Sequence, residues 1–205
     1  MTWMEKLSMR LAVRLKTEET PYSVGQLAHG IEIVLQNILH GFALVVTAAL
    51  FGQVREVILV SFLFFIHRLF SGGVHLKSPW TCLAATLTLM NAGGYLVKSL
   101  SETPPSHALW PVGIGLAIAF LVNYRYAPVE HTYFTAQPRI KRVNRSIILI
   151  MVLFGCTLSL FLVEYAYQIA VAYTVAVLLQ SLLLLPVSFQ LASQLDKIVE
   201  RMRVK

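Results

Sequence analysis

The 205-residue chain lacks most of the residue patterns on which hydrolytic sites are built. Asp196 is its only aspartate, which makes a pair of catalytic aspartates impossible. The chain contains neither the His-Glu-x-x-His motif of zinc peptidases nor the Gly-x-Ser-x-Gly motif of serine hydrolases. The six histidines show no metal-ligand spacing, so we expect neither a metal nor a cofactor. Two cysteines, Cys82 and Cys156, suggest no disulfide framework.

Charge is also scarce, whereas apolar residues are abundant. Hydrophobic residues make up 57% of the chain and charged residues 13%, and the mean hydropathy is +0.67. Several stretches approach the roughly 20 residues needed to cross a bilayer. This composition predicts an all-α, polytopic integral membrane protein and disfavours a soluble helical one. The net charge is +7, but no basic cluster is interleaved with exposed aromatic residues, so we expect no nucleic-acid partner.

The apolar stretches predict about six transmembrane helices, and four to six fit the pattern. The predicted spans cover residues 30–51, 54–69, 79–97, 109–123, 146–163 and 169–190. We therefore predict a single membrane domain over residues 1–205, in which 1–20 form an amphipathic N-terminal helix, 30–190 the transmembrane bundle and 191–205 a basic cytoplasmic tail.

The N-terminal segment has the pattern of an interfacial helix. Met4, Leu7, Leu11 and Leu15 recur at helical spacing, and basic residues occupy another face. A helix of this kind lies in the membrane interface against anionic lipid.

The basic residues predict an orientation in the cell membrane. If the N-terminus is inside, 15 of the 17 Lys and Arg residues fall in inside segments, and only Arg55 and Lys98 fall outside. This asymmetry predicts an even number of spans with both termini in the cytoplasm. It also places His75 and Cys82 at the cytoplasmic face, where thiols stay reduced.

His75 and Cys82 are seven positions apart in a short connection between two apolar runs. An imidazole and a thiol are the pair that a cysteine nucleophile requires. Ser78 is predicted to cap the next helix and Pro79 to be its first residue. Cys82 then lies in the first turn, where the helix dipole favours the thiolate.

Two glycines precede this pair. Gly72 and Gly73 allow the connection to fold back, so that His75 approaches the helix start. The alternative for Cys82 is the usual role of a lone cysteine in an apolar segment, a small and inert core residue. We assign that role to Cys156. A second polar feature, Asn91 with the neighbouring Gly93 and Gly94, is assigned to helix packing.

One face of the first span carries polar side chains at helical spacing, including Glu32 and Gln36. A charged group in a span is costly and usually faces the bundle interior or a polar cavity. Two interpretations stay open. Glu32 and Gln36 orient His75 or hold a substrate backbone, or they only form hydrogen bonds between helices.

The connection around His75 resembles the signature of the accessory gene regulator B (AgrB) family, in the run Arg68-x-x-x-Gly72-Gly73-x-His75-x-Lys77-Ser78-Pro79 and then Cys82. Further agreement lies in His29-Gly30-Ile31-Glu32 with Asn37, in Tyr126-Ala127-Pro128-Val129-Glu130 and in Leu185-Pro186. The chain departs from the family pattern at Leu76 and in the longer run 131–138.

The resemblance implies a membrane cysteine endopeptidase of quorum sensing in a Gram-positive bacterium. Its substrate would be a short autoinducer propeptide with an amphipathic N-terminus and an acidic tail. Cys82 would be the nucleophile, which forms a thioester, and His75 the general base. A Cys or Ser of the propeptide would then close a thiolactone or lactone ring. Arg68, Gly72 and Gly73 would support activity, and the enzyme would be a homodimer.

Alternatives remain for the basic residues and for the function. The cluster Arg139, Lys141, Arg142 and Arg145 either attracts the acidic tail of the propeptide or only sets topology. The main rival function is a non-enzymatic transporter or export component for the peptide, with Cys82 as a packing residue. A receptor or sensor module is a second rival.

Overall fold

The computed structural model describes residues 3–74, 76, 78–102, 105–129 and 138–203. In these ranges the chain forms α-helices and no β-strand, so the all-α prediction is confirmed for this part of the chain. The helices are α1 (Trp3–Leu15), α2 (Val24–Leu50), α3 (Val54–Ser71), α4 (Pro79–Ser101), α5 (Pro105–Tyr126), α6 (Pro138–Leu162), α7 (Tyr167–Leu182) and α8 (Pro186–Arg203).

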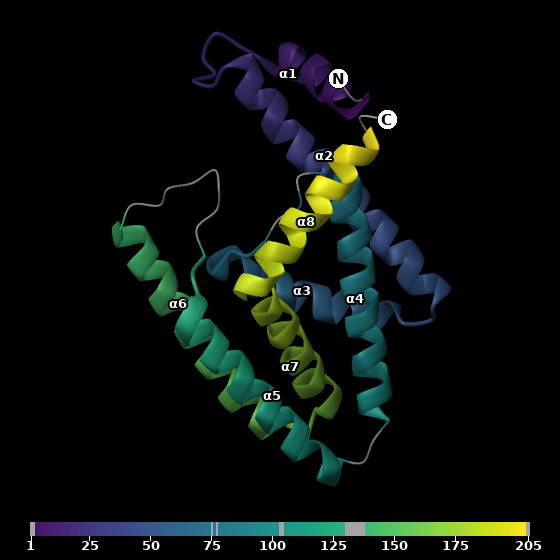
Figure 1. The fold of residues 1–205 in the computed structure, drawn as a ribbon, viewed down its shortest axis with the longest axis vertical. Helices are drawn as coiled ribbons and strands as arrows, with labels where there is room; N and C mark the ends of the chain where they lie inside the picture. Colours follow the sequence, from purple (N-terminus) through teal and green to yellow (C-terminus); the bar gives the residue numbers. More distant parts are fainter. Residues whose placement is uncertain (1–2, 75, 77, 103–104, 130–137, 204–205) are drawn as a thin grey trace. The chain divides into compact units, whose positions relative to one another are not determined.

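The chain divides into two compact units, Met1–Val46 and Thr47–Lys205. The first holds α1 and most of α2, and the second holds α3 to α8 (Figure 1). The prediction of a single membrane domain stays a prediction.

In the first unit, α2 begins at a reciprocal cap. The Gln26 backbone N–H donates to Ser23 Oγ at 3.2 Å, and the Ser23 N–H donates to Gln26 Oε1 at 2.9 Å. The α1 segment is helical as predicted, and two members of its predicted apolar stripe, Leu7 and Leu15, are exposed. Its position at the membrane surface stays a prediction.

The core of the second unit is built around α7. This helix packs against α3, α4, α5 and α6 (Figure 1). Nearly every residue from Ala170 to Ser181 is buried. A helix buried on all sides must be apolar almost throughout, which explains why the sequence there shows no amphipathic pattern.

Small residues let these helices approach one another. A Cβ added at Gly93 would lie 2.8 Å from Leu179 Cδ1, and one added at Gly115 would lie 2.8 Å from Thr174 Cγ2. A Cβ at Gly94 would clash with Val57 Cγ2. The prediction that Gly93 and Gly94 serve helix packing is therefore confirmed.

The structure does not confirm the count of six spans. By length and composition, two of the described helices can cross a membrane, at Val24–Leu50 and Arg139–Leu162, and a third candidate is the bent pair of α7 and α8. The predicted spans 54–69, 79–97 and 109–123 do correspond to helices α3, α4 and α5.

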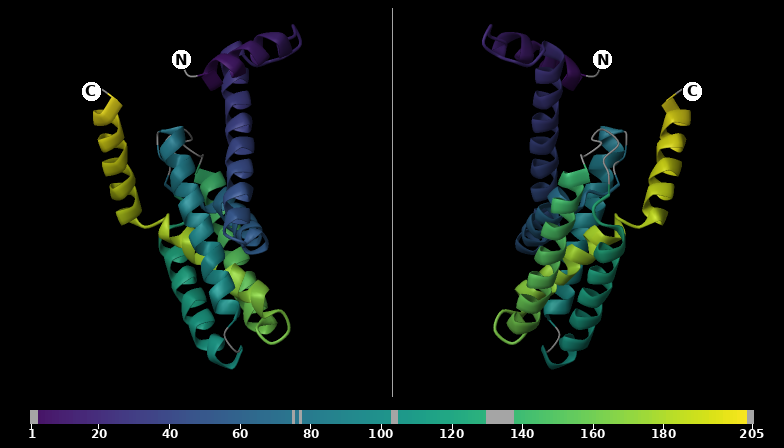
Figure 2. Two further views of the ribbon diagram at one scale, coloured as in Figure 1. Left: turned by 90° about the vertical axis from the view of Figure 1, so that its right-hand side faces the viewer. Right: turned by 90° about the vertical axis from the view of Figure 1, so that its left-hand side faces the viewer.

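The predicted span over 169–190 is broken into two helices. α7 ends at Leu182, α8 begins at Pro186, and the two are bent by 66°. Proline has no N–H to donate and its ring clashes with the preceding turn, so a helix ends before it. Both views of Figure 2 show α8 leaving the end of α7. The residues predicted as a basic tail form most of α8.

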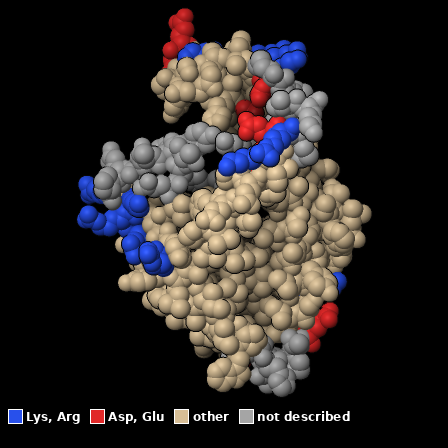
Figure 3. Space-filling model, viewed as in Figure 1, with Lys and Arg blue, Asp and Glu red and all other residues tan. Residues whose placement is uncertain are grey.

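The α3–α7 bundle has two ends of different charge. We call the end where α3, α5 and α7 finish and α4 and α6 begin the loop end. Its described cations are Arg68, Arg125, Arg139, Lys141, Arg142 and Arg145. The opposite end has Arg55 and Lys98 together with the acids Glu56, Glu102 and Glu164. In Figure 3, blue atoms gather where α6 begins and tan atoms cover the middle of the bundle.

Replacement of Gly94 by Ala should weaken the contact between α3 and α4. The new methyl group would clash with Val57 Cγ2 and lie 3.2 Å from the Val57 backbone nitrogen. We expect Gly94→Ala to lower the free energy of unfolding by about 1–3 kcal/mol, the usual cost of overpacking. Denaturant titration in detergent micelles measures this change.

Gly113→Ala is the matched control, because a Cβ at Gly113 in α5 would meet open space. It should be neutral or stabilise the helix by up to about 1 kcal/mol. If Gly94→Ala lowers the free energy of unfolding no more than Gly113→Ala does, the close approach of α3 and α4 at Gly94 is contradicted.

Candidate functional site

The connection from α3 to α4 folds back at two glycines. The Gly72 N–H donates to Arg68 O at 3.0 Å and closes the last turn of α3. Gly72 has φ +72° and ψ −148°, and Gly73 has φ +137°. L-residues with a Cβ rarely adopt such angles. These angles are those of a glycine turn, as predicted, and the approach of His75 to the start of α4 stays a prediction.

Arg68 reaches across the turn that follows it. Its Nη2 donates to Val74 O at 2.6 Å, and its guanidinium lies 5.8 Å from the centre of the Phe64 ring. A Cβ on Gly73 would lie 3.1 Å from Arg68 Nη1, so only glycine leaves the guanidinium its full space. Arg68 Nη1 is buried and has no hydrogen-bond partner among the described residues. Arg68 therefore fixes the peptide group that immediately precedes His75.

Cys82 lies in the first turn of α4, as predicted. Ser78 has extended backbone angles at the N-cap position and Pro79 is the first helical residue, although the Ser78 side chain makes no capping hydrogen bond. The Cys82 N–H donates to Ser78 O at 3.0 Å. Cys82 is half-buried and is not joined to another cysteine.

His75 and Lys77 lie outside the described residues. The pairing of His75 with Cys82 therefore stays a prediction. Of the residues next to this stretch, Val74 is bonded by Arg68 and Leu183, and Ser78 O accepts the Cys82 N–H.

Two further segments enclose the turn at the loop end. The Val129 N–H donates to Ser71 O at 2.9 Å, which joins the segment after α5 to the end of α3. From α7, Gln180 Nε2 donates to Ser71 Oγ at 2.6 Å and to Gly72 O at 2.7 Å. The Val74 N–H donates to Leu183 O at 3.2 Å. The turn is thus bonded to segments that are distant in the sequence.

Sequence reasoning missed the role of Gln180. The available signal was a polar amide within the apolar run 169–184, since such residues usually bond to a neighbouring helix. Its partner could not be read from the pattern, because nothing local links Gln180 to Ser71 and Gly72.

Other predicted site residues lie elsewhere. Glu32 and Gln36 are half-buried on α2, in the first compact unit. Both interpretations of these residues stay predictions.

The basic cluster lies on a helix rather than in a loop, because α6 begins at Pro138, eight residues before the predicted start at 146. Proline suits the first helical position. Arg139, Lys141 and Arg142 are exposed. Arg145 instead joins α6 to α5, since its Nη2 donates to Tyr124 O at 3.1 Å and its guanidinium lies over the Tyr124 ring.

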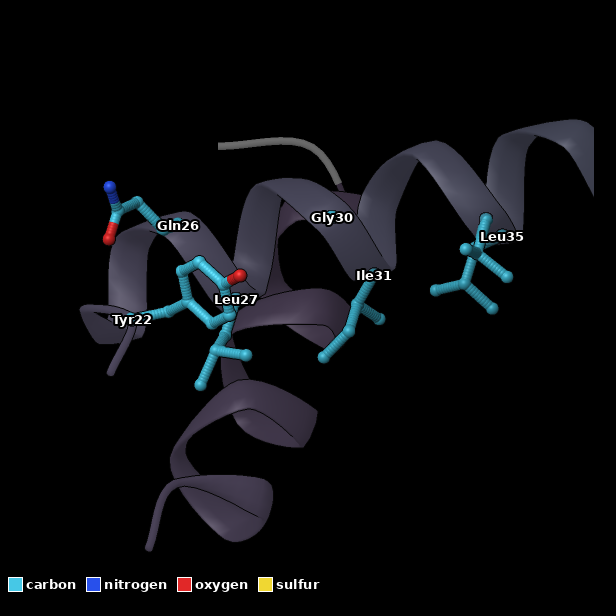
Figure 4. A pocket seen from close by; sticks show the side chains of 7 residues that line it. Tyr22, Gln26, Leu27, Gly30, Ile31 and Leu35 are labelled. Atoms are coloured by element: carbon cyan, nitrogen blue, oxygen red, sulfur yellow. The ribbon is translucent and has the colours of Figure 1, made fainter. Parts of the chain in front are cut away.

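A separate groove lies within the first unit. It is lined almost entirely by apolar atoms of residues 22–35, and Figure 4 shows the side chains of Tyr22, Leu27, Ile31 and Leu35 along it. It contains no nucleophile. Among the described side chains, no group of three His, Cys, Asp or Glu residues is placed to hold a metal ion.

The family comparison covers most of the chain. A model described as accessory gene regulator B (AgrB) matches residues 4–184. A similar curated protein is an AgrB-like protein of Clostridium acetobutylicum, 30% identical over 157 residues, which are 75% of this chain and 72% of that protein. No solved structure matches the chain significantly.

Replacement of Gly72 by Ala should disrupt the site. It would force an L-residue to φ +72° and place a Cβ 2.5 Å from Val129 O. We expect a loss of unfolding free energy above the roughly 1–3 kcal/mol of a residue in a strained backbone region, because the clash adds to that cost. Thermal unfolding in micelles measures it.

Gly52→Ala supplies the comparison, because Gly52 has φ +62° and open space around it. It should show the conformational cost without the clash. Equal losses at the two positions would mean that the contact between Gly72 and Val129 does not constrain the turn.

Proposed function

This chain belongs to the accessory gene regulator B family, and from that premise we propose that it is a membrane-embedded cysteine endopeptidase that processes a short quorum-sensing propeptide. The observation that best supports the proposal is the placement of Cys82 in the first turn of α4, at the end of the short connection that begins with the Gly72–Gly73 turn and its Arg68–Val74 hydrogen bond.

The first step forms an acyl-enzyme. His75 accepts the thiol proton, and the Cys82 sulfur attacks the carbonyl carbon of the scissile peptide bond. The carbon–nitrogen bond then breaks, and His75 returns the proton to the leaving amine, which departs with the acidic tail. The remaining part of the propeptide stays bound to Cys82 as a thioester.

The second step closes a ring. A Cys thiol or Ser hydroxyl of the bound peptide attacks the thioester carbonyl, its proton passes to His75, and the Cys82 sulfur leaves. The product is a cyclic thiolactone or lactone. A tethered nucleophile competes with water because its effective concentration is high.

Arg68, Gly72 and Gly73 support this chemistry through the turn. Arg68 holds Val74 O, the carbonyl directly before His75. Gly73 leaves space for the Arg68 guanidinium, and Gly72 adopts a positive φ angle that a residue with a Cβ rarely adopts. Glu32 and Gln36 are candidates to orient His75 or the substrate backbone.

The membrane arrangement belongs to the same proposal. We assign six spans, both termini and the active site at the cytoplasmic face, an interfacial α1, and a homodimer in the cell membrane of a Gram-positive bacterium. The concentration of described cations at the loop end supports this orientation. The helix pair α7 and α8 counts as the sixth span in this arrangement.

Cys82→Ala and His75→Ala should each abolish cleavage of a co-expressed propeptide with a central Cys or Ser and an acidic tail. The expected loss is roughly a thousandfold or more, because each change removes a group that acts on the reacting atoms. Mass spectrometry should detect cleaved peptide and an adduct on Cys82 in the parent protein.

Cys156→Ala is the matched control, since Cys156 lies on α6 with its thiol directed to Leu116 O. It should cleave normally. A protein that tolerates both the Cys82 and His75 changes and forms no adduct would instead fit a transporter or a sensor.

Reversal of charge at Arg139, Lys141 and Arg142 should slow processing of the propeptide about three- to tenfold while membrane insertion is unchanged. The reason is the lost attraction between these exposed cations and an acidic tail. The difference should shrink as ionic strength rises. Arg55→Glu, at the opposite end, serves as control. Unchanged processing in the triple variant would leave the cluster a purely topological role.

A further inference from the structure

Gln180 is a fully buried amide whose nitrogen donates hydrogen bonds to the end of α3 and to Gly72. It is 0% exposed on α7, and its Nε2 donates to Ser71 Oγ and to Gly72 O at 2.6 and 2.7 Å. Gly72 O can only accept, which fixes the nitrogen of the amide on this side. Ser71 Oγ in turn donates to His67 O at 2.8 Å. Both N–H groups of the Gln180 amide therefore donate to the end of α3 and the residue after it.

The backbone around Gly73 is held from two sides. On one side, Gln180 of α7 donates to Gly72 O. Leu183, the residue after α7, accepts the Val74 N–H through its backbone oxygen. On the other side, Arg68 bonds Val74 O. The backbone N–H and C=O of Val74, the last described residue before His75, are thus both hydrogen-bonded.

We infer that Gln180 is a positioning residue of the active site: its amide holds Gly72 O so that the turn presents His75 to Cys82. This inference rests on the proposed function, because it assigns Gln180 a role toward the imidazole–thiol pair. Gln180 does not contact the reacting atoms itself. It acts through the turn.

A packing role alone leads to a different expectation. Asn123 on α5 is a second buried amide, 1% exposed, and it donates to Ala119 O and Ser181 Oγ at 2.9 and 2.8 Å. None of its described bonds reaches the turn. If buried amides serve only to join helices, loss of either one should affect the protein in the same way.

The test measures alkylation of Cys82 by iodoacetamide across pH in the full-length protein, reconstituted in lipid vesicles and carrying Cys156→Ala. Arg68, the cation that bonds the turn, is unchanged in every variant. We expect Gln180→Met to slow alkylation at pH 7 about tenfold, because the turn no longer holds the His75 imidazole where it can accept the thiol proton. Asn123→Leu should stay within about twofold of the parent.

Gln180→Glu is the second variant. It keeps the shape of the side chain but places a carboxylate oxygen against Gly72 O, so it should slow alkylation at least as much as Gln180→Met. A folded Gln180 variant with the parent profile would overturn the inference, as would equal slowing by Asn123→Leu. Failure of both Gln180 variants to fold while Asn123→Leu folds would also overturn it, by assigning Gln180 to the stability of the bundle.

The two proposals fail separately. If Cys82→Ala still cleaves the propeptide, the proposed function is wrong. If cleavage requires Cys82 but is unchanged in Gln180→Met, the function stands and only the positioning role is lost.

Discussion

Inside an apolar bundle, every peptide group outside a helix needs a hydrogen-bond partner, since burial of an unpaired one costs about 1–3 kcal/mol. The connection between α3 and α4 meets this requirement at Gly72 O, Val74 N and Val74 O. The partners are Gln180, Leu183 and Arg68. Because these partners are themselves buried or at the end of a helix, the turn has little freedom to adopt another shape.

The position of α7 makes this possible. A helix that is packed against four others can deliver an amide to the end of α3 only if its neighbours come close, and glycines at the contacts with α4, α5 and α6 allow that approach. The position of the turn at the loop end of the bundle thus depends on glycines at the helix contacts in the middle of the bundle. Packing and site geometry are not separate properties in this protein.

Local features could be predicted from the sequence. The start of α4 follows from Ser78 and Pro79, and the turn follows from two adjacent glycines. Long-range contacts could not be predicted in this way, because the bonds from Gln180 and Val129 to Ser71 join residues 109 and 58 positions apart. The break before Pro186 lies inside the predicted span, because the apolar residues resume after Gln180 and Ser181 and continue to the proline.

The shortness of α7 is compatible with its place in the bundle. Its 16 residues span about 24 Å, less than the roughly 30 Å of a typical hydrocarbon layer. Because α7 is enclosed by α3, α4, α5 and α6, which have 18 to 25 residues each, it does not have to match the thickness of a bilayer by itself. The length of the central helix is therefore set by its neighbours and by the turn that it bonds.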